Sequence, residues 1–282
     1  MKLKILLLPL VIFFQIDLIH GQGWDLTVRK NVFDKNQIAK PAQLNIIIPD
    51  SGSDSYSINT GISLIKESAY VTEYFQFEYG FSGEYHRNSK IDKEQNILAG
   101  SVAGFSIIRL PTEKTVKFIN TLAIKFKSDF ENNTESLHTD LKIVPIIPHW
   151  DISDYFGPDN FKFLFEPSGG FYYETILKDS KNLDGSIIRG YSTGALGIYP
   201  FWENTEEMIQ ITIDKTWWFD LFERDFLSND QTTDPELLEI ALQIYFNKAK
   251  NAGLRFEYID GTDPKINLFD QEYFQVSFTF KR

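Results

Sequence analysis

The chain of 282 residues contains no cysteine, so disulfide bridges and cysteine-based metal or redox sites are excluded. Cations are also scarce, because 28 lysines and arginines face 39 aspartates and glutamates and the formal net charge is −11. The absence of a basic stripe argues against nucleic acid or an anionic lipid surface as the main partner. Beyond the N-terminus, no apolar run approaches the roughly 18 residues that a membrane helix needs, so any membrane crossing must be by strands.

The N-terminus has the three-part layout of a secretory signal peptide. Lys2 and Lys4 precede the apolar run 5–14, and a short tail follows. We therefore expect a cleaved signal peptide over 1–22 and an exported mature chain, with a core helix or strand as the alternative. Residues 23–40 lack a clear period and are interpreted as an N-terminal lead-in segment: a periplasmic lead-in, a segment inside a barrel, or a first strand.

Aromatic residues are abundant, at 15% of the chain with 25 phenylalanines, and many of them fall at every second position. In the stretch 75–86, aromatic residues share one face and polar residues the other, and the stretches 117–131 and 161–178 repeat the pattern. A period of two predicts β-strands with one apolar and one polar face. These strands run past about ten residues, which is longer than the usual five or six.

The alternation predicts an all-β fold of about twelve antiparallel strands. We expect them at 41–48, 56–66, 73–86, 96–110, 115–130, 137–147, 160–177, 186–201, 207–221, 236–247, 253–259 and 271–281. Polar and sometimes long connections follow the odd-numbered strands, and mostly tight turns follow the even-numbered ones. This asymmetry is typical of outer-membrane barrels, with short periplasmic turns and longer outer loops, although the long connection 148–159 breaks it.

The segment 234–253 fits two interpretations. Asp234 and Pro235 suit the start of a helix, and the lysines and glycine near its end suit a helix terminus. Its residues also alternate, and the polar positions Glu239 and Gln243 match the polar faces of the other strands. We favour a strand, since a helix here would break the barrel count.

Alternation alone does not separate a soluble β-sandwich from a membrane barrel. In lipid, every backbone group needs a protein partner, so a spanning sheet must close on itself. The aromatic bands favour a membrane because aromatic residues concentrate at its interfaces. These bands include Tyr172-Tyr173, Tyr199, Phe201-Trp202 and Trp217-Trp218. The alternative is that they are core aromatics of a sandwich.

The chain ends on "FQVSFTFKR", in which the apolar positions alternate with polar ones: Phe274, Val276, Phe278 and Phe280. This ending resembles the C-terminal signature of bacterial outer-membrane β-barrel proteins, a last strand with alternating apolar residues and an aromatic at or near its end. Lys281 and Arg282 depart from the signature, which usually ends on the aromatic. The resemblance implies a single transmembrane β-barrel over 41–282, recognition by the barrel insertion machinery, and a last strand that pairs with the first to close the ring.

In such a barrel, strand parity predicts which charged side chains line the lumen. This set comprises Glu78, Glu84, Lys117, Lys125, Lys127, Asp129, Lys162, Glu166, Glu174 and Arg255. Opposite charges on these residues would either interlock and plug the barrel or line a narrow passage for small polar solutes. The sequence leaves both possibilities open.

Catalytic and metal sites find little support in the sequence. His86 and Ser89 lie close together, as in a barrel lipase, but a spacing of three directs them to opposite faces of a strand. The histidines lack metal-ligand spacing, and the acidic stretches 49–55 and 260–264 are interpreted as turns rather than calcium loops. We therefore assign no catalytic residue, no metal and no cofactor.

These observations predict an exported protein of the Gram-negative outer membrane. It would act as a passive small-solute channel or as a non-enzymatic barrel subunit of an envelope complex. Its partners would be outer-membrane lipid, the insertion machinery and, in the second case, other envelope proteins. The alternative is a secreted soluble β-sandwich that binds a ligand such as a glycan, and an enzyme embedded in the barrel ranks third.

Overall fold

The computed structural model describes residues 24–29, 42–48, 55–88, 95–111, 116–179, 185–202, 208–224, 235–247, 252–266 and 268–280. Most of these residues lie in strands, and two short 3₁₀ segments interrupt them, η1 (Pro148–Trp150) and η2 (Pro264–Ile266). None of the helical segments in these ranges has the length and apolar character that crossing a bilayer requires. The expected signal peptide, 1–22, lies outside the described residues.

The described part of the chain forms one sheet of fourteen strands. The strands are β1 (Trp24–Arg29), β2 (Ala42–Ile48), β3 (Ser55–Val71), β4 (Phe75–Asn88), β5 (Gln95–Arg109), β6 (Lys117–Asp129), β7 (Thr134–Ile146), β8 (Tyr155–Phe156), β9 (Phe161–Lys178), β10 (Ser186–Pro200), β11 (Ile209–Arg224), β12 (Glu236–Tyr245), β13 (Ala252–Asp263) and β14 (Leu268–Phe280). Several exceed twelve residues, as the long alternating stretches predicted.

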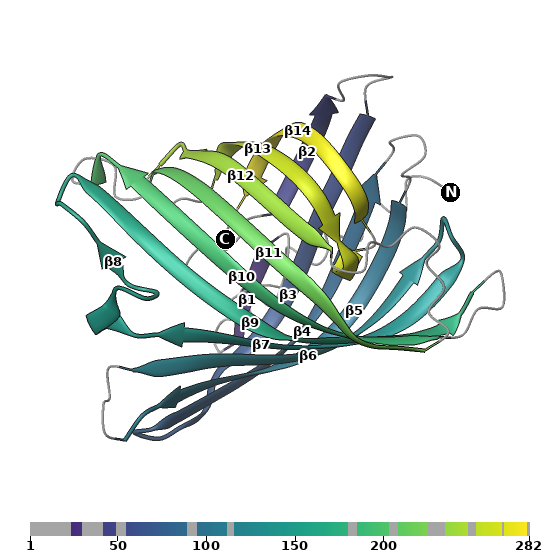
Figure 1. Ribbon diagram of the computed structural model, residues 1–282, viewed down its shortest axis with the longest axis horizontal. Coiled ribbons are helices and arrows are strands. Elements are labelled where there is room, and N and C mark those ends of the chain that lie inside the picture. The colour runs from purple at the N-terminus through teal and green to yellow at the C-terminus, as the bar shows by residue number, and fades with distance from the viewer. Residues whose placement is uncertain are drawn as a thin grey trace.

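The strand pairings are antiparallel and follow the chain. From β3 to β7 and from β9 to β14, each strand pairs with the next, and β7 pairs with β9. β2 pairs with β14 through one edge and with β3 through the other. Figure 1 shows a strongly curved sheet in which the yellow strand β14 lies beside β2. The predicted all-β, antiparallel fold is confirmed, and the ambiguous segment forms the strand β12.

Two short strands add to the expected set, so the sheet has fourteen strands rather than about twelve. One of them, β1, realises the first strand that was one of the alternatives for 23–40. β1 pairs with β3 from Gly61 to Lys66, just past the positions where β2 pairs, and therefore places a strand within the lead-in segment 23–40. β8 pairs with β9 beyond the last pair that β9 forms with β7. The long connection 148–159 thus supplies a strand to an edge of β9 that β7 does not reach.

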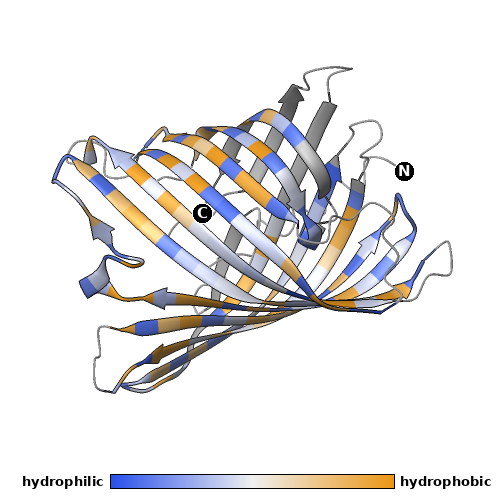
Figure 2. Cartoon of the chain, in the orientation of Figure 1, coloured by the Kyte–Doolittle hydropathy of each residue, from blue (hydrophilic) through white to orange (hydrophobic). Residues whose placement is uncertain are grey.

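The two faces of the sheet have the reverse of the usual polarity. On β6, Lys127 and Asp129 are only 3% and 2% exposed, whereas Leu122 and Ile124 on the other face are each 50% exposed. Figure 2 shows this alternation of hydrophilic and hydrophobic residues along the strands. A soluble sandwich buries its apolar face and leaves its charges in water. A barrel in lipid does the opposite, and the described strands follow the barrel pattern.

Some apolar residues also lie on the buried face. One small group contains Ile65, Ala103, Phe105 and Ala123, and another contains Tyr172, Tyr191 and Trp218. The expected aromatic bands are therefore only half right. Tyr172, Tyr199 and Trp218 are buried, whereas Tyr173, Phe201 and Trp217 are exposed, because successive residues of a strand point to opposite faces.

Candidate functional site

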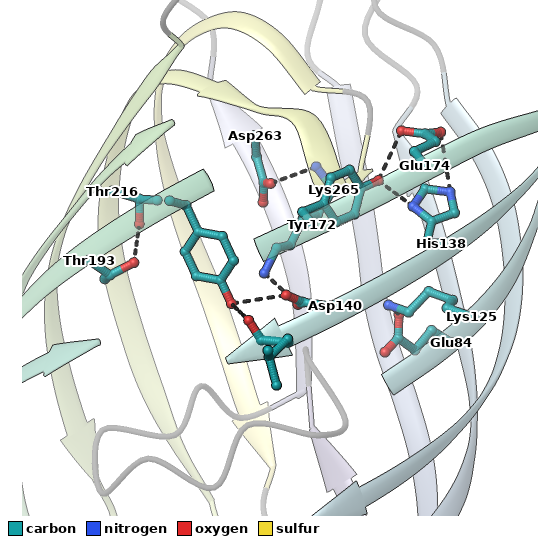
Figure 3. A network of polar contacts seen from close by, with 12 residues as sticks. Glu84, Lys125, His138, Asp140, Tyr172, Glu174, Thr193, Thr216, Asp263 and Lys265 are labelled. Atoms are coloured by element: carbon teal, nitrogen blue, oxygen red, sulfur yellow. Dashed lines mark hydrogen bonds and ion pairs between the residues drawn. The ribbon is translucent and has the colours of Figure 1, made fainter. Parts of the chain in front are cut away.

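The buried face carries a connected group of polar side chains from β6, β7 and β9, which we call the histidine cluster: Lys127, Ser136, His138, Tyr172 and Glu174. His138 Nε2 lies 2.6 Å from Ser136 Oγ and 3.2 Å from Glu174 Oε1, and Tyr172 bonds His138 Nδ1. The Tyr172 hydroxyl also donates to Glu174 Oε2 over 2.9 Å, and Lys127 Nζ lies 3.8 Å from Glu174 Oε1. Figure 3 shows Glu174, His138 and Tyr172 converging.

The histidine cluster contains a serine, a histidine and a glutamate, but it lacks the geometry of a hydrolase triad. In a triad, the acid orients one imidazole nitrogen while the other faces the nucleophile. Here Ser136 and Glu174 share Nε2, and Tyr172 occupies Nδ1. Each member is also nearly inaccessible to water, and hence to substrate. The cluster is therefore best described as a satisfied buried network, which rigidifies its surroundings.

Sequence reasoning did not single out Ser136 and His138 as a pair. They lie two residues apart on β7 and share the buried face with Asp140. The alternation of polar residues at 136, 138 and 140 was the available signal. Their partners on β9 follow from the register, in which His138 pairs with Glu174 and Asp140 pairs with Tyr172.

A second group joins β4 and β6. Lys125 Nζ lies 2.6 Å from Glu84 Oε2, and His86 Nε2 lies 3.4 Å from the same oxygen. His86 is buried beside Glu84, and Ser89, which the sequence analysis argued against as its lipase partner, lies outside the described residues. The histidine is thus placed against a carboxylate rather than in an open site.

A third group joins β13 and β14 through Arg255, Glu257 and Gln275. Arg255 donates to Glu257 Oε1 from Nη2 over 2.5 Å and from Nε over 3.0 Å, and Gln275 donates to Glu257 Oε2. Glu257 and Gln275 are both 0% exposed. A carboxylate without access to water requires such partners, since burying an unpaired charge is very costly.

A fourth group brings a connection between strands onto the wall of the sheet. Lys265, in η2, donates to Asp140 Oδ2 over 2.6 Å. Its Nζ lies 4.1 Å from the ring centroid of Tyr191 and 5.3 Å from that of Trp218. The Tyr191 hydroxyl donates to Asp140 Oδ1 over 2.9 Å. Figure 3 shows Lys265 directed toward Asp140.

The residues predicted to line a lumen all lie on the buried face or at its margin. Seven are buried, namely Glu78, Glu84, Lys127, Asp129, Glu166, Glu174 and Arg255. Three are half-buried, namely Lys117, Lys125 and Lys162. Lys162 lies at the beginning of β9, where it donates to the carbonyl oxygen of Gly157 over 3.0 Å. Strand parity thus selected the correct face, and the role of these residues in lining a lumen stays a prediction.

The predicted closing strand is β14, which pairs with β2 over residues 274–280. Phe274 is exposed and Val276 is half-buried, so this part of the alternation turns its apolar residues outward. The side chains of Phe278 and Phe280, together with Lys281 and Arg282, lie outside the described part of the chain.

The acidic turns are accounted for where the structure describes them. Asp263 Oδ1 accepts a hydrogen bond from the backbone N–H of Lys265 over 3.0 Å, which is ordinary turn chemistry. Asp50 and Asp54 lie outside the described residues. Within the described ranges, no three histidine, aspartate or glutamate side chains gather as a metal site would require.

Comparisons with known proteins find similarity in structure and none in sequence. No family model and no curated protein matches the chain. Among solved structures, the NanC porin is similar at 11% identity and a TM-score of 0.46, over 86% of this chain and 100% of that one. The β domain of the Bordetella autotransporter BrkA is similar at 10% identity and a TM-score of 0.41, over 91% of this chain and 97% of that one.

The translocator domain of the autotransporter NalP from Neisseria meningitidis is also similar, at 9% identity and a TM-score of 0.38, over 95% of both chains. These neighbours are outer-membrane β-barrels, the architecture that the ending of this chain resembles. With TM-scores below 0.5, the likenesses carry no argument about function.

Proposed function

We propose that this protein is an outer-membrane β-barrel of twelve strands, β2 to β7 and β9 to β14, with a filled interior. The successive pairings support closure of the sheet into a ring. They lead from β2 to β3, then strand by strand to β14, and β14 pairs with β2 again. β1 and β8 then lie beside this ring as additional short strands.

The exposed face supports a location in lipid. Its large apolar residues come from strands along the whole chain and include Phe81, Val102, Ile124, Phe171 and Trp217. Apolar area on this scale would be an aggregation hazard in water, whereas it is the normal outer surface of a barrel in a bilayer. Its partner is therefore outer-membrane lipid, reached through export by the N-terminal signal and folding by the insertion machinery.

We further propose that the barrel is a non-enzymatic subunit of the cell envelope that associates with other envelope proteins, rather than an open passive channel. The burial of the charged residues supports the part of this proposal that excludes an open channel. Arg189 is 1% exposed, and it pairs with Asp220 through an Nε to Oδ1 contact of 2.6 Å. The wall of a water-filled pore would be wet. The interlocking of opposite charges, as between Lys127 and Glu174 or Arg255 and Glu257, instead supports a filled interior.

Three measurements, one on fractionated cells and two on the purified protein, test this function. We expect the protein to be recovered with membranes unless detergent is added. On a denaturing gel, unheated samples should migrate differently from heated ones. In a planar lipid bilayer, the protein should carry no sustained current. Recovery in the soluble periplasmic fraction would contradict the barrel. A sustained current from folded wild-type protein would contradict the filled interior and favour a channel.

A further inference from the structure

The connection between β13 and β14 does not turn away from the sheet. Residues 261–266, which we call the strap, comprise the end of β13 and the η2 segment that follows it. They place Lys265 against Asp140 of β7, Tyr191 of β10 and Trp218 of β11. In the order of pairing, four strands separate β13 from β7, namely β12, β11, β10 and β9. In a closed ring of twelve strands, the strap therefore reaches across the interior to the far wall.

The sequence of the strap explains its inward course. Gly261 has φ of +115°, and a Cβ there would overlap the carbonyl oxygen of Glu236, so only glycine fits. Asp263 accepts the N–H of Lys265, and Pro264 starts η2 with its φ already restricted. Pro264 is buried, which fixes the turn against its surroundings.

The contact of the strap with the far wall differs from the pair of Arg255 and Glu257 in its access to water, because both of its side chains are partly exposed. The side chains of Lys265 and Asp140 are each 28% exposed, whereas those of Arg255 and Glu257 are 5% and 0% exposed. Water and ions reach the first pair and not the second. An ion pair in contact with water can be broken and re-formed at modest cost, whereas opening the inaccessible pair would leave a buried charge uncompensated.

We propose that the strap is a latch that closes the interior of the barrel, and that its release opens a path for ions. This inference rests on the proposed closed barrel. The contact of Lys265 with Asp140, Tyr191 and Trp218 holds the latched state. When it is lost, the strap leaves the far wall, and the freed passage is bordered by Asp140 and by the neighbouring charges of Glu84 and Lys125.

Because the chain contains no cysteine, introduced cysteines are the only thiols that a cross-linker can join. In the double variant Asp140→Cys with Lys265→Cys, the ionic contact is gone and two thiols face each other. Because a lysine side chain bridges the wild-type gap, a short reversible bis-thiosulfonate linker replaces the contact, and a reductant removes it. Current is recorded in planar bilayers for the reduced, linked and re-reduced protein.

We expect the reduced double variant to be open about ten to a hundred times as often as the wild type, which corresponds to the loss of one charge-assisted hydrogen bond. Linking should silence it, and the reductant should restore the current. The matched control is Glu135→Cys with Lys178→Cys, an exposed pair 3.3 Å apart at the ends of β7 and β9. Linking this pair should leave the current unchanged.

The outcomes separate the latch from the filled barrel. If the wild type and the reduced double variant both stay silent while migrating as folded barrels, the latch is overturned and the filled barrel stands. If the wild type conducts and the linked double variant is silent, the latch stands and the filled resting state fails. If the linked double variant conducts as freely as the reduced one, the latch is overturned.

Discussion

Replacing Arg255 by methionine should leave the carboxylate of Glu257 buried without its cation. In the wild type this carboxylate accepts two hydrogen bonds from Arg255, of 2.5 and 3.0 Å, and it has no exposure to water. Removing one partner of such a pair costs about 3–5 kcal/mol of unfolding free energy. Gln275 still donates to Glu257, but a neutral amide cannot offset a full charge.

The double variant Arg255→Met with Glu257→Gln removes both charges and should lose much less. Replacing both members of a buried pair by groups of similar size is often nearly neutral. We therefore expect the double variant to cost about 0–2 kcal/mol. The two single variants should thus be strongly non-additive, with a coupling of about 3 kcal/mol.

The assay is denaturant unfolding of the protein in lipid vesicles, followed by tryptophan fluorescence. The control cycle uses the exposed pair Glu135 and Lys178, which should show a coupling of at most about 1 kcal/mol. If Arg255→Met costs less than about 1 kcal/mol and the cycle is additive, the buried charge network does not hold the barrel together as described.

Three further changes test separate parts of the structure. Tyr172→Phe removes the hydroxyl that bonds Glu174 and His138 and should lower the unfolding free energy by about 1–3 kcal/mol, whereas Tyr173→Phe, on the exposed face, should change it by less than about 0.5. Leu122→Arg should lower the unfolding free energy in vesicles by about 2–4 kcal/mol if the exposed face of β6 contacts lipid, and a negligible change would contradict that contact. Gly261→Ala should cost about 1–3 kcal/mol through backbone strain, and an unchanged denaturation midpoint would argue against the inward turn of the strap.

Strand parity made much of this fold predictable from the sequence. The alternation over 75–86, 117–131 and 161–178 identified β4, β6 and β9, and it assigned charged residues such as Lys127 and Glu174 to the correct face. A period of two is a local property, so a single strand is enough to reveal it.

Contacts between strands were not predictable in the same way. Whether Glu174 meets Lys127 or another cation depends on the register, which local alternation does not specify. The sequence pattern groups Tyr172-Tyr173 and Trp217-Trp218 as aromatic bands, although neighbouring residues of a strand must face opposite ways. β8 is too short for a periodic signal, and the contact between Lys265 and Asp140 joins residues that are 125 positions apart.

The most direct test of the lipid-facing surface uses Trp217 and Trp218, which are 46% and 4% exposed. The chain has five tryptophans, and each of two variants keeps only one of this pair, with the other four replaced. Both variants are folded into vesicles whose acyl chains carry bromine at a series of depths. Bromine quenches tryptophan fluorescence only on close approach. We expect strong quenching of Trp217 and little quenching of Trp218. Equal quenching of both, or none of either, would contradict a barrel whose apolar face meets lipid.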